Sequence, residues 1–450
     1  MLRKNIYKLS PIQIIVSAYF IAIVVVTGLL MLPISLKPGV SLSFVDALFT
    51  ATSAVSVTGL TTVSTPETFS TFGSVVLISA FQLGGIGVMT LGTFIWILFG
   101  TPIGLSQRRL IMVDQNRYNL SGLVQLMKLV LGMALLFEAV GAVIFGLYFY
   151  FAGYYDSLAT SFYYGIFHSI STYTNAGFDL FGNSLLDFAD DYFVISLTAI
   201  LIILGAIGFP VLVELREYFF GGHKRFRFSL YTKVTTFTFG ILLVLGTIGV
   251  WVVEDSRYLA GMTWHEKFFY SMFLSVTARS AGLVTVDPSD LSVTSQFFTS
   301  ILMFIGASPS SVGGGIRTTT LAVMILTIIT FARGRNEVRI FGRSLRQDDI
   351  NKSFVFFSTA SILVISGILI LEMVDGHRFS LSAIIFNICS AFGTCGMSIG
   401  AISESTPVSK MVLVLLMYIG RIGMMPFLSI FISGKAKADI HYPEEKIIIG

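Results

Sequence analysis

Long apolar runs separated by short polar segments dominate the chain. The runs are rich in Leu, Ile, Val and Phe, and they cover residues 11–36, 71–100, 121–153, 192–219, 229–253, 295–332, 353–374 and 408–433. A helix needs roughly 20 apolar residues to cross the hydrocarbon core of a bilayer. The pattern therefore predicts an all-α integral membrane protein with eight transmembrane helices.

Composition and charge agree with this prediction and add an orientation. Of the 450 residues, 54% are hydrophobic and 12% are charged, whereas soluble domains carry about 25% charged residues. Lys and Arg concentrate at both termini and in the segments 101–120, 220–228 and 333–352, while the other loops hold few. The positive-inside rule then places both termini in the cytoplasm. We interpret the basic segments as orientation signals, so no nucleic-acid partner is expected.

The segments on the outer side repeat a motif four times. Each has a short apolar stretch followed by small and polar residues that end in Gly: SAVSVTGL (53–60), STYTNAGF (171–178), VTARSAGL (276–283) and SAFGTCGM (390–397). A second glycine motif follows each one after 24 to 28 residues: QLGGIG (82–87), ILGAIG (203–208), FIGASP (304–309) and YIGRIG (418–423). Two motifs that keep register over four copies indicate internal repetition.

The repeated unit is a helix, a loop that enters half of the membrane, and a second helix. Its four copies are predicted at 1–100, 101–222, 223–346 and 347–434, with a cytoplasmic tail at 435–450. The short helix of each unit would point its C-terminal carbonyls to mid-membrane, where the dipole favours a cation. Backbone carbonyls of the following strand can replace the hydration shell of an ion.

We therefore predict one pore around a pseudo-fourfold axis, with K⁺ bound by backbone carbonyls. The alternative for any single small-residue segment is a re-entrant turn or a helix-packing contact. The candidate filter residues are Ser56, Val57, Thr58, Gly59, Thr174, Asn175, Ala176, Gly177, Arg279, Ser280, Ala281, Gly282, Gly393, Thr394, Cys395 and Gly396.

These units resemble the Trk/Ktr/HKT superfamily of potassium transporters over nearly the whole chain. Eight spans and the ending HYPEEKIIIG (441–450) are most similar to the membrane subunit of the bacterial Ktr system. The resemblance implies potassium uptake by a homodimer in the bacterial cell membrane, with one pore in each protomer. It also implies a cytosolic ring of RCK-domain subunits that bind adenine nucleotide and, in many members, activation by Na⁺. The resemblance further implies K⁺ rather than Na⁺ preference, because all four filter positions are glycine here.

Three arginines fall within the apolar part of the chain, where ionisable residues are functional candidates. We expect Arg279 to point behind the filter and to bond carbonyls or a carboxylate, since an unpaired buried charge is costly. Arg421 aligns in height with the segment 306–317, so a contact between them is expected. Glu138 is either a partner for such a charge or a residue at a helix interface.

The run 295–332 is too long for one span. Its 38 residues would extend about 57 Å as a helix, against a core of about 30 Å. We predict a break at GASPSSVGGGIR and a helix that resumes at about Thr318. The resemblance assigns this loop the role of gate. The positive charge of Arg317 in a cation path would act as an electrostatic plug, and Arg421 is expected to anchor the loop through backbone carbonyls. The gate residues are Gly306, Ala307, Ser308, Pro309, Ser310, Ser311, Val312, Gly313, Gly314, Gly315, Ile316 and Arg317.

Other classes of function fit less well. A phosphate-binding loop would need a Gly-Lys-Ser/Thr ending and a preceding strand. The histidines show no metal-ligand spacing, so neither an intramembrane enzyme nor a cofactor in this chain is expected. A substrate-coupled transporter would favour inverted twofold symmetry over a parallel fourfold repeat. Channel and coupled mechanisms both stay open for the predicted pore.

Overall fold

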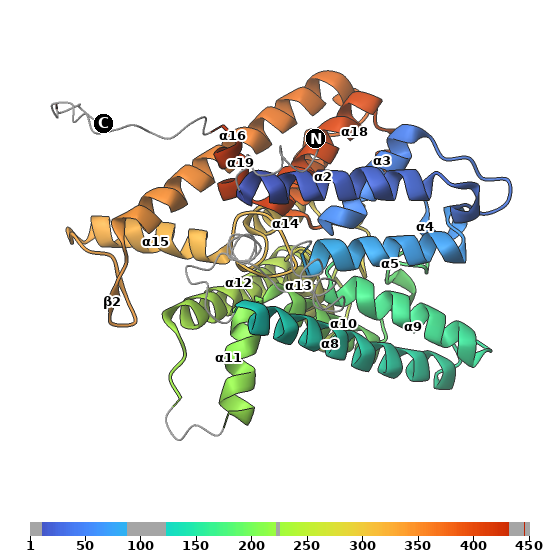
Figure 1. Ribbon diagram of the computed structural model, residues 1–450, viewed down its shortest axis with the longest axis horizontal. Coiled ribbons are helices and arrows are strands. Elements are labelled where there is room, and N and C mark those ends of the chain that lie inside the picture. The colour runs from blue at the N-terminus through green and yellow to red at the C-terminus, as the bar shows by residue number, and fades with distance from the viewer. Residues whose placement is uncertain (1–10, 88–122, 222–225, 432–444, 446–450) are drawn as a thin grey trace, which may run out of the picture.

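The computed structural model describes residues 11–87, 123–221, 226–431 and 445. Outside these described residues lie both terminal segments, the whole segment 101–120, the end of the apolar run 71–100 and, except for Glu445, the tail predicted at 435–450. Most helices run along the longest axis of the molecule, side by side (Figure 1).

The described elements form four successive sets, each with a first helix, a short helix and a second helix. The first set is α2 (Pro11–Leu30), η1 (Pro33–Ser35), α3 (Phe44–Ser56), α4 (Thr65–Thr68) and α5 (Thr71–Gly85). The second is α8 (Leu123–Phe151), α9 (Leu158–Tyr173), η2 (Leu186–Phe188), α10 (Tyr192–Ala206) and α11 (Phe209–Phe220).

The third and fourth sets follow the same order. The third is α12 (Leu230–Glu254), α13 (Trp264–Thr277), η3 (Pro288–Asp290), α14 (Val293–Ile305) and α15 (Thr318–Ala332). A hairpin of β1 (Arg339–Ile340) and β2 (Arg343–Ser344) pairs Arg339 with Ser344 and joins the two sets. The fourth is α16 (Gln347–Asp375), α17 (Leu381–Gly393), η4 (Ile402–Glu404), α18 (Pro407–Ile422) and α19 (Met424–Ile430).

Hydroxyl side chains define where many of these helices begin. A Ser or Thr oxygen accepts a first-turn backbone N–H at the start of six helices, and these caps are Ser43, Ser70, Ser229, Ser292, Ser380 and Thr406. Such caps satisfy donors that the helix itself leaves unpaired. Two caps also bind the end of the preceding long helix: Glu254 accepts from Ser292, and Asp375 accepts from Thr406. These bonds close the third and fourth sets at one end.

The four sets form a closed ring. The second helix of each set packs against the short helix of the next: α5 on α9, α10 on α13, α14 on α17, and α18 back on α3. This arrangement brings the four glycine loops that follow the short helices to a common centre.

Two of the predicted spans are not continuous. The run 192–219 is divided into α10 and α11, bent by 103°, and the run 408–433 into α18 and α19, bent by 108°. Gly208 and Gly423 lie at the breaks with φ of +105° and +86°, a left-handed conformation that ends a helix and that only glycine adopts at little cost. The sequence analysis predicted a span in each of these runs but not its break, which arises because the glycine motif interrupts its helix in these copies too.

The break predicted at 306–317 is confirmed, since α14 ends at Ile305 and α15 begins at Thr318. Among the described residues, four helices are long and apolar enough to cross a membrane, or six if each bent pair is one span. The count of eight crossings stays a prediction.

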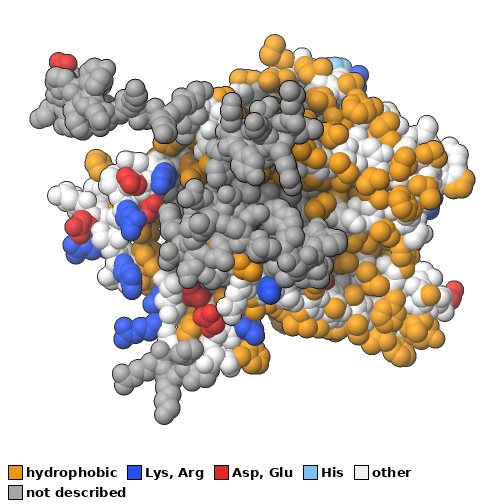
Figure 2. All heavy atoms as spheres, viewed as in Figure 1, with side chains coloured by type: hydrophobic (Ala, Val, Ile, Leu, Met, Phe, Trp, Pro, Cys, Tyr) orange, Lys and Arg blue, Asp and Glu red, His pale blue; other side chains and the backbone are white. Residues whose placement is uncertain are grey.

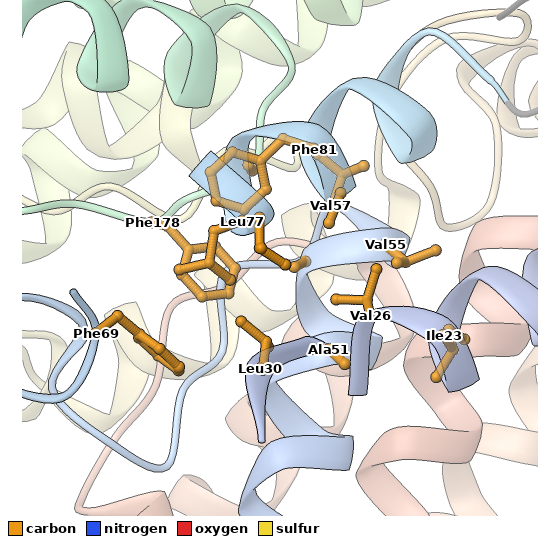
Figure 3. Packing of buried hydrophobic residues seen from close by; sticks show 14 of the residues in the cluster. Ile23, Val26, Leu30, Ala51, Val55, Val57, Phe69, Leu77, Phe81 and Phe178 are labelled. Carbon is orange, nitrogen blue, oxygen red and sulfur yellow. The ribbon is translucent and has the colours of Figure 1, made fainter. Parts of the chain in front are cut away.

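Apolar side chains fill the spaces between the sets. In the cluster shown in Figure 3, Phe81 of α5 lies 5.0 Å, between ring centroids, from Phe178, which belongs to the second set. Leu30 of α2 and Val57 pack in the same cluster. On the face shown in Figure 2, Lys and Arg side chains gather at the end that carries the β-hairpin, while the opposite part is mostly hydrophobic.

Candidate functional site

The short helices α3, α9, α13 and α17 all end next to the repeated glycines. Their last residues lie three to five positions before Gly59, Gly177, Gly282 and Gly396, and their last turns are buried. The last carbonyls of a helix have no partner within the helix and carry its negative dipole end. Four such ends therefore surround one centre with partial negative charge.

The four glycines form a ring of backbone contacts. A Cβ atom placed on Gly59 would lie 2.8 Å from the carbonyl oxygen of Ala176, and one placed on Gly177 would lie 2.8 Å from that of Ala281. A Cβ on Gly282 would collide with the carbonyl oxygen of Cys395, and one on Gly396 with that of Thr58. Each loop thus presents the carbonyl just before its glycine to a neighbouring loop, and a side chain at any of these glycines would enter that space.

Backbone strain recurs at equivalent positions in these loops. The residue two before each glycine has a positive φ although it is not glycine: 56° at Val57, 55° at Asn175, 86° at Ser280 and 47° at Thr394. The glycines are also left-handed, with φ between 73° and 105°. Such residues cost of the order of 1–3 kcal/mol each and cluster at functional sites. A backbone of alternating hand turns successive carbonyls to one side, whereas a β-strand points them to both sides.

Hydroxyl groups of the short helices hold the loops in this conformation. Ser53 Oγ accepts the Gly59 N–H at 3.0 Å, and Ser390 Oγ accepts the Gly396 N–H at 3.0 Å. In the other two copies the hydroxyl donates to the carbonyl after the glycine: Ser171 to Phe178 and Thr277 to Leu283, both at 2.6 Å. The third copy has Val276 in the aligned position, and Thr277 supplies the hydroxyl one residue later.

All the predicted filter residues lie in these loops or in the last turn of the short helices. They are buried except Gly59, Gly177 and Gly396, which are partly accessible. Most of the side chains that can be placed contact protein: Ser56 Oγ lies 2.7 Å from Thr58 Oγ1, and Cys395 Sγ lies 3.3 Å from the carbonyl oxygen of Thr277. The Asn175 amide has no hydrogen-bond partner among the described residues, and the backbone carbonyls before the four glycines converge on the common centre.

Arg279 is the charged member of this set, and its side chain lies behind the loop. Its guanidinium stands 5.0 Å from the ring centroid of Phe239 on α12, and Nη1 donates to the carbonyl of Gly306 at 3.4 Å. Its Nε and Nη2 atoms are buried without a partner among the described residues. Cation–π attraction over the ring offsets part of the cost of this burial.

The second glycine motif explains how the short helices approach so closely. A Cβ on Gly84, Gly205 or Gly420 would collide with the carbonyl of Val55, Tyr173 or Phe392 respectively, each four residues before a loop glycine. Small residues allow two helix backbones to touch in this way. In the third copy, a Cβ on Gly306 would instead collide with the carbonyl of Gly314. In this copy the first glycine of the motif therefore packs against the 306–317 loop and not against a short helix.

The 306–317 loop is held by bonds to several elements. Its Ser308 and Val312 N–H groups donate to the carbonyls of Ala206 and Gly205, at the end of α10. Its Ser310 carbonyl accepts the N–H of Phe209 at 2.8 Å, and its Pro309 carbonyl accepts the hydroxyl of Tyr231 at 2.6 Å. Irregular backbone inside a membrane protein needs such internal partners.

Two arginine side chains donate hydrogen bonds to backbone carbonyls of the 306–317 loop. Arg317 folds back on it and donates to the carbonyls of Ser308 and Gly313. Arg421, from α18, donates to the carbonyl of Val312 in the loop and to those of Gly84 and Gly85 at the end of α5. A guanidinium offers five donors, so Arg421 joins the first set, the fourth set and the loop.

The loop also contacts the ring of glycine loops directly. Ser280 Oγ accepts the Gly314 N–H at 3.2 Å and donates to the carbonyl of Thr394 at 2.7 Å. A Cβ on Gly314 would meet Thr394 Oγ1. The 306–317 loop therefore lies against two of the four glycine loops.

Comparison with known proteins decides the family. Residues 7–438 match the family model described as TrkH, cation transport protein. The chain belongs to the TrkH family. The resemblance inferred from the sequence is thus confirmed at family level.

Three relatives of this TrkH family member cover nearly its whole length. It is 50% identical over 447 residues to the Ktr system potassium uptake protein D of Bacillus subtilis, with 99% of each chain covered. It is 34% identical over 456 residues to the potassium/sodium uptake protein NtpJ of Enterococcus hirae, covering 100% of this chain and 99% of that protein. The crystal structure of the potassium transporter TrkH from Vibrio parahaemolyticus matches with a TM-score of 0.74, 18% identity, and 94% and 86% of the two chains covered. These relatives are transporters and not enzymes, as the sequence analysis expected.

Several residues of this TrkH family site were missed from the sequence. Ser280 was proposed for the filter but not as a link to Gly314, and Tyr231 was not singled out. Nothing in the local sequence marks a tyrosine in the first turn of a helix as a partner for a loop 78 residues away. The hydroxyls of Ser53, Ser171 and Ser390 could have been found, since they align six residues before each glycine.

Proposed function

We propose that this chain is the ion-conducting membrane subunit of a potassium uptake system. The observation that carries the proposal is the closed ring of Gly59, Gly177, Gly282 and Gly396, in which carbonyls and not side chains converge. Carbonyl oxygens suit a dehydrated alkali cation. The names of the potassium uptake relatives support the same ion.

Selectivity in this proposal rests on the predicted filter residues, which bind K⁺ through their carbonyls. Glycine at every ring position supports K⁺ over Na⁺, as the resemblance implies. The name of the relative NtpJ includes sodium, which makes Na⁺ the second ion to test, both as a competitor and as an activator.

The 306–317 loop is proposed as the gate, with Arg421 as its anchor. The support is its contact with Ser280 and Thr394 in the ring and the variety of elements that hold it. An ion that leaves the ring on this side would meet the loop next. Arg317 adds positive charge there, although it donates its two hydrogen bonds to the loop's own Ser308 and Gly313 carbonyls.

The proposed setting is a homodimer in a bacterial cell membrane, with both termini in the cytoplasm. A cytosolic RCK-domain ring that binds adenine nucleotide would regulate it. Support comes from the word "system" in the relative's name and from exposed arginines around the hairpin, which include Arg335, Arg339 and Arg343. The segment 333–352 is proposed to face the ring, and residues 441–450 a second protomer.

The experiment that tests the function is ion flux into liposomes that contain the purified chain. We expect K⁺ uptake that Na⁺ competes with weakly, and an increase when a regulatory ring and adenine nucleotide are added. Transport of another substrate without K⁺ movement would overturn the proposal. Growth of a transporter-deficient bacterium at limiting K⁺, with and without the ring subunit, gives the same test in cells.

Crosslinking tests the partners separately. Cysteines introduced one at a time in 333–352 and in 441–450 should crosslink to the ring and to a second protomer respectively. Capture of neither partner from either segment would remove this part of the proposal and leave the conduction proposal intact.

A further inference from the structure

Glu138 is a buried carboxyl group that the proposed conduction path does not use. It lies in the middle of α8, and only 3% of its surface is exposed. The sequence left two readings for it, a partner for an intramembrane charge or a residue at a helix interface. The structure places it at an interface, because its side chain accepts a hydrogen bond from Gln82 of α5.

The hydrogen bond between Glu138 and Gln82 leaves one oxygen unpaired on each side chain. Gln82 Nε2 donates to Glu138 Oε2 at 2.5 Å. Glu138 Oε1 and Gln82 Oε1 are both buried, and neither has a hydrogen-bond partner among the described residues. Two acceptor oxygens therefore remain, one on each member of a bonded pair. A buried acceptor without a donor costs about 1–3 kcal/mol, and more when the group is charged.

The surroundings supply no cation that would pair with an ionised Glu138. No ion pair of Glu138 occurs among the described residues of the elements around it. His168 of α9 bonds Thr198 instead, and the hydroxyl of Tyr173 has no hydrogen-bond partner in the part of the chain that the structure describes. The other titratable or charged groups on the elements that pack against α8 are Tyr163 and Tyr164 of α9, Tyr192 of α10, and Glu214, Arg216, Glu217 and Tyr218 of α11.

We propose that Glu138 is a proton-binding site and holds its proton when the protein is in its resting conformation. A proton on Glu138 Oε1 would turn that oxygen into a donor for the unpaired Oε1 of Gln82. One proton taken from water would give both unpaired oxygens a hydrogen bond. The carboxylic acid of Glu138 and the amide of Gln82 would then be joined by two hydrogen bonds. The proton also removes the negative charge that burial penalises.

The site is connected to the anchor of the 306–317 loop. Gln82 precedes Gly84 and Gly85, whose carbonyls accept from Arg421, by two and three residues on the same helix. While Glu138 is neutral, Arg421 is free to bind these carbonyls and that of Val312. Loss of the proton would charge Glu138 and break its second bond to Gln82, which would disturb the end of α5 whose carbonyls bind Arg421 and so weaken the hold of Arg421 on the loop. This second step rests on the proposed gate, whereas the proton itself does not.

Infrared spectroscopy of the reconstituted full chain tests the proton without measuring transport. We compare wild type with Glu138→Gln, which mimics the neutral acid in shape, and with Glu404→Gln, an exposed glutamate given the same change. At neutral pH the carbonyl stretch of a protonated carboxylic acid should be lost in Glu138→Gln and retained in Glu404→Gln. If Glu138→Gln loses only carboxylate bands, Glu138 is ionised and binds a cation or a water molecule, and the proposal is overturned. Equal melting temperatures for Glu138→Gln and wild type would show that the variant is folded.

Flux against pH tests the connection to Arg421. In wild type and in Glu404→Gln, K⁺ flux should rise at alkaline pH as the proton is lost, by about tenfold if one charge-assisted bond is weakened. Glu138→Gln has no proton to lose, so its profile should stay flat over the same range. An alkaline rise in Glu138→Gln equal to that of wild type would overturn the connection, and the infrared result would still decide the proton.

Discussion

The glycine loops and the 306–317 loop are made of the same small residues but are held in different ways. Each glycine loop is fixed by its own short helix, as when Ser53 binds Gly59 or Ser390 binds Gly396, and has residues of positive φ enclosed by protein. The 306–317 loop instead bonds to distant elements, from Gly205 and Ala206 to Tyr231 and Arg421.

This difference indicates which region can move. A segment held by local bonds keeps its conformation as long as its own helix is folded. A segment held by partners on several helices changes its conformation when those helices shift, because each hydrogen bond joins it to a different helix. We therefore expect the glycine loops to set a fixed geometry and the 306–317 loop to respond to the cytoplasmic side. The predictions below test this division.

We expect the largest effect where the backbone of a second helix touches the backbone of a short helix, as α18 touches α17. Gly420→Ala puts a methyl group into the carbonyl of Phe392, which belongs to a helix and cannot move aside. Overpacking of this kind costs about 1–3 kcal/mol, so the yield of folded protein and its melting temperature should fall. Gly240→Ala is the matched control, because a Cβ on this α12 glycine meets nothing within 4 Å. Equal stability of the two variants would contradict the close contact.

Deletion of Ser308 to Gly314 should have the next largest effect. It removes the part of the loop that lies below the ring together with the Arg421 contact, so flux should rise about a hundredfold or more and depend less on the regulatory ring. The ratio of K⁺ to Na⁺ flux should hardly change, since the glycine loops are intact. A folded deletion variant with unchanged or lower flux would make the loop a scaffold and not a gate.

Arg421→Ala should act in the same direction but less strongly. The loop keeps its bonds to Gly205, Ala206 and Tyr231 and loses only the donation to Val312. Charge-assisted bonds contribute about 1.5–3 kcal/mol, which corresponds to a ten- to hundredfold bias between closed and open states. Single-vesicle or radiotracer flux measures it. A fall in flux with correct folding would mean that Arg421 supports the open state.

Gly59→Ser tests the glycine loops, the region proposed to set ion selectivity. The new side chain would meet the carbonyl of Ala176 and would have to adopt a φ of +95°, which costs a residue other than glycine about 1–2 kcal/mol. We expect K⁺ over Na⁺ discrimination to fall about tenfold, while control by the regulatory ring is unchanged. Competition assays on serine variants of all four glycines would expose an incorrect filter assignment if discrimination stayed the same in each.

The sequence predicted this organisation where a physical rule applied to neighbouring residues. The break at Ile305 and Thr318 followed from length, because 38 residues cannot cross a bilayer as one helix. The four glycine loops followed from register. The breaks at Gly208 and Gly423 were missed, since runs of ordinary length gave no reason to expect them.

Contacts between distant segments could not be predicted in the same way. The hydrogen bonds of Tyr231 to Pro309 and of Gln82 to Glu138 depend on how the sets pack. Neither pair has a spacing that marks it in the sequence. The expected contact of Arg421 with the loop was an exception, because the repeat gave both segments the same height.

Tyr231→Phe is the smallest and most specific test of the comparison. It removes one neutral hydrogen bond, from the tyrosine hydroxyl to the Pro309 carbonyl at 2.6 Å, and keeps the ring in place. A bond of this kind contributes about 0.5–1.5 kcal/mol, so flux should rise about two- to tenfold. Tyr418→Phe is the matched control, because its hydroxyl donates to the Val16 carbonyl at 2.7 Å, away from the loop. Both variants lose the same group, and only Tyr231→Phe should change flux. If the two change flux equally, or if neither does, the 306–317 loop does not depend on its distant partners in the way proposed.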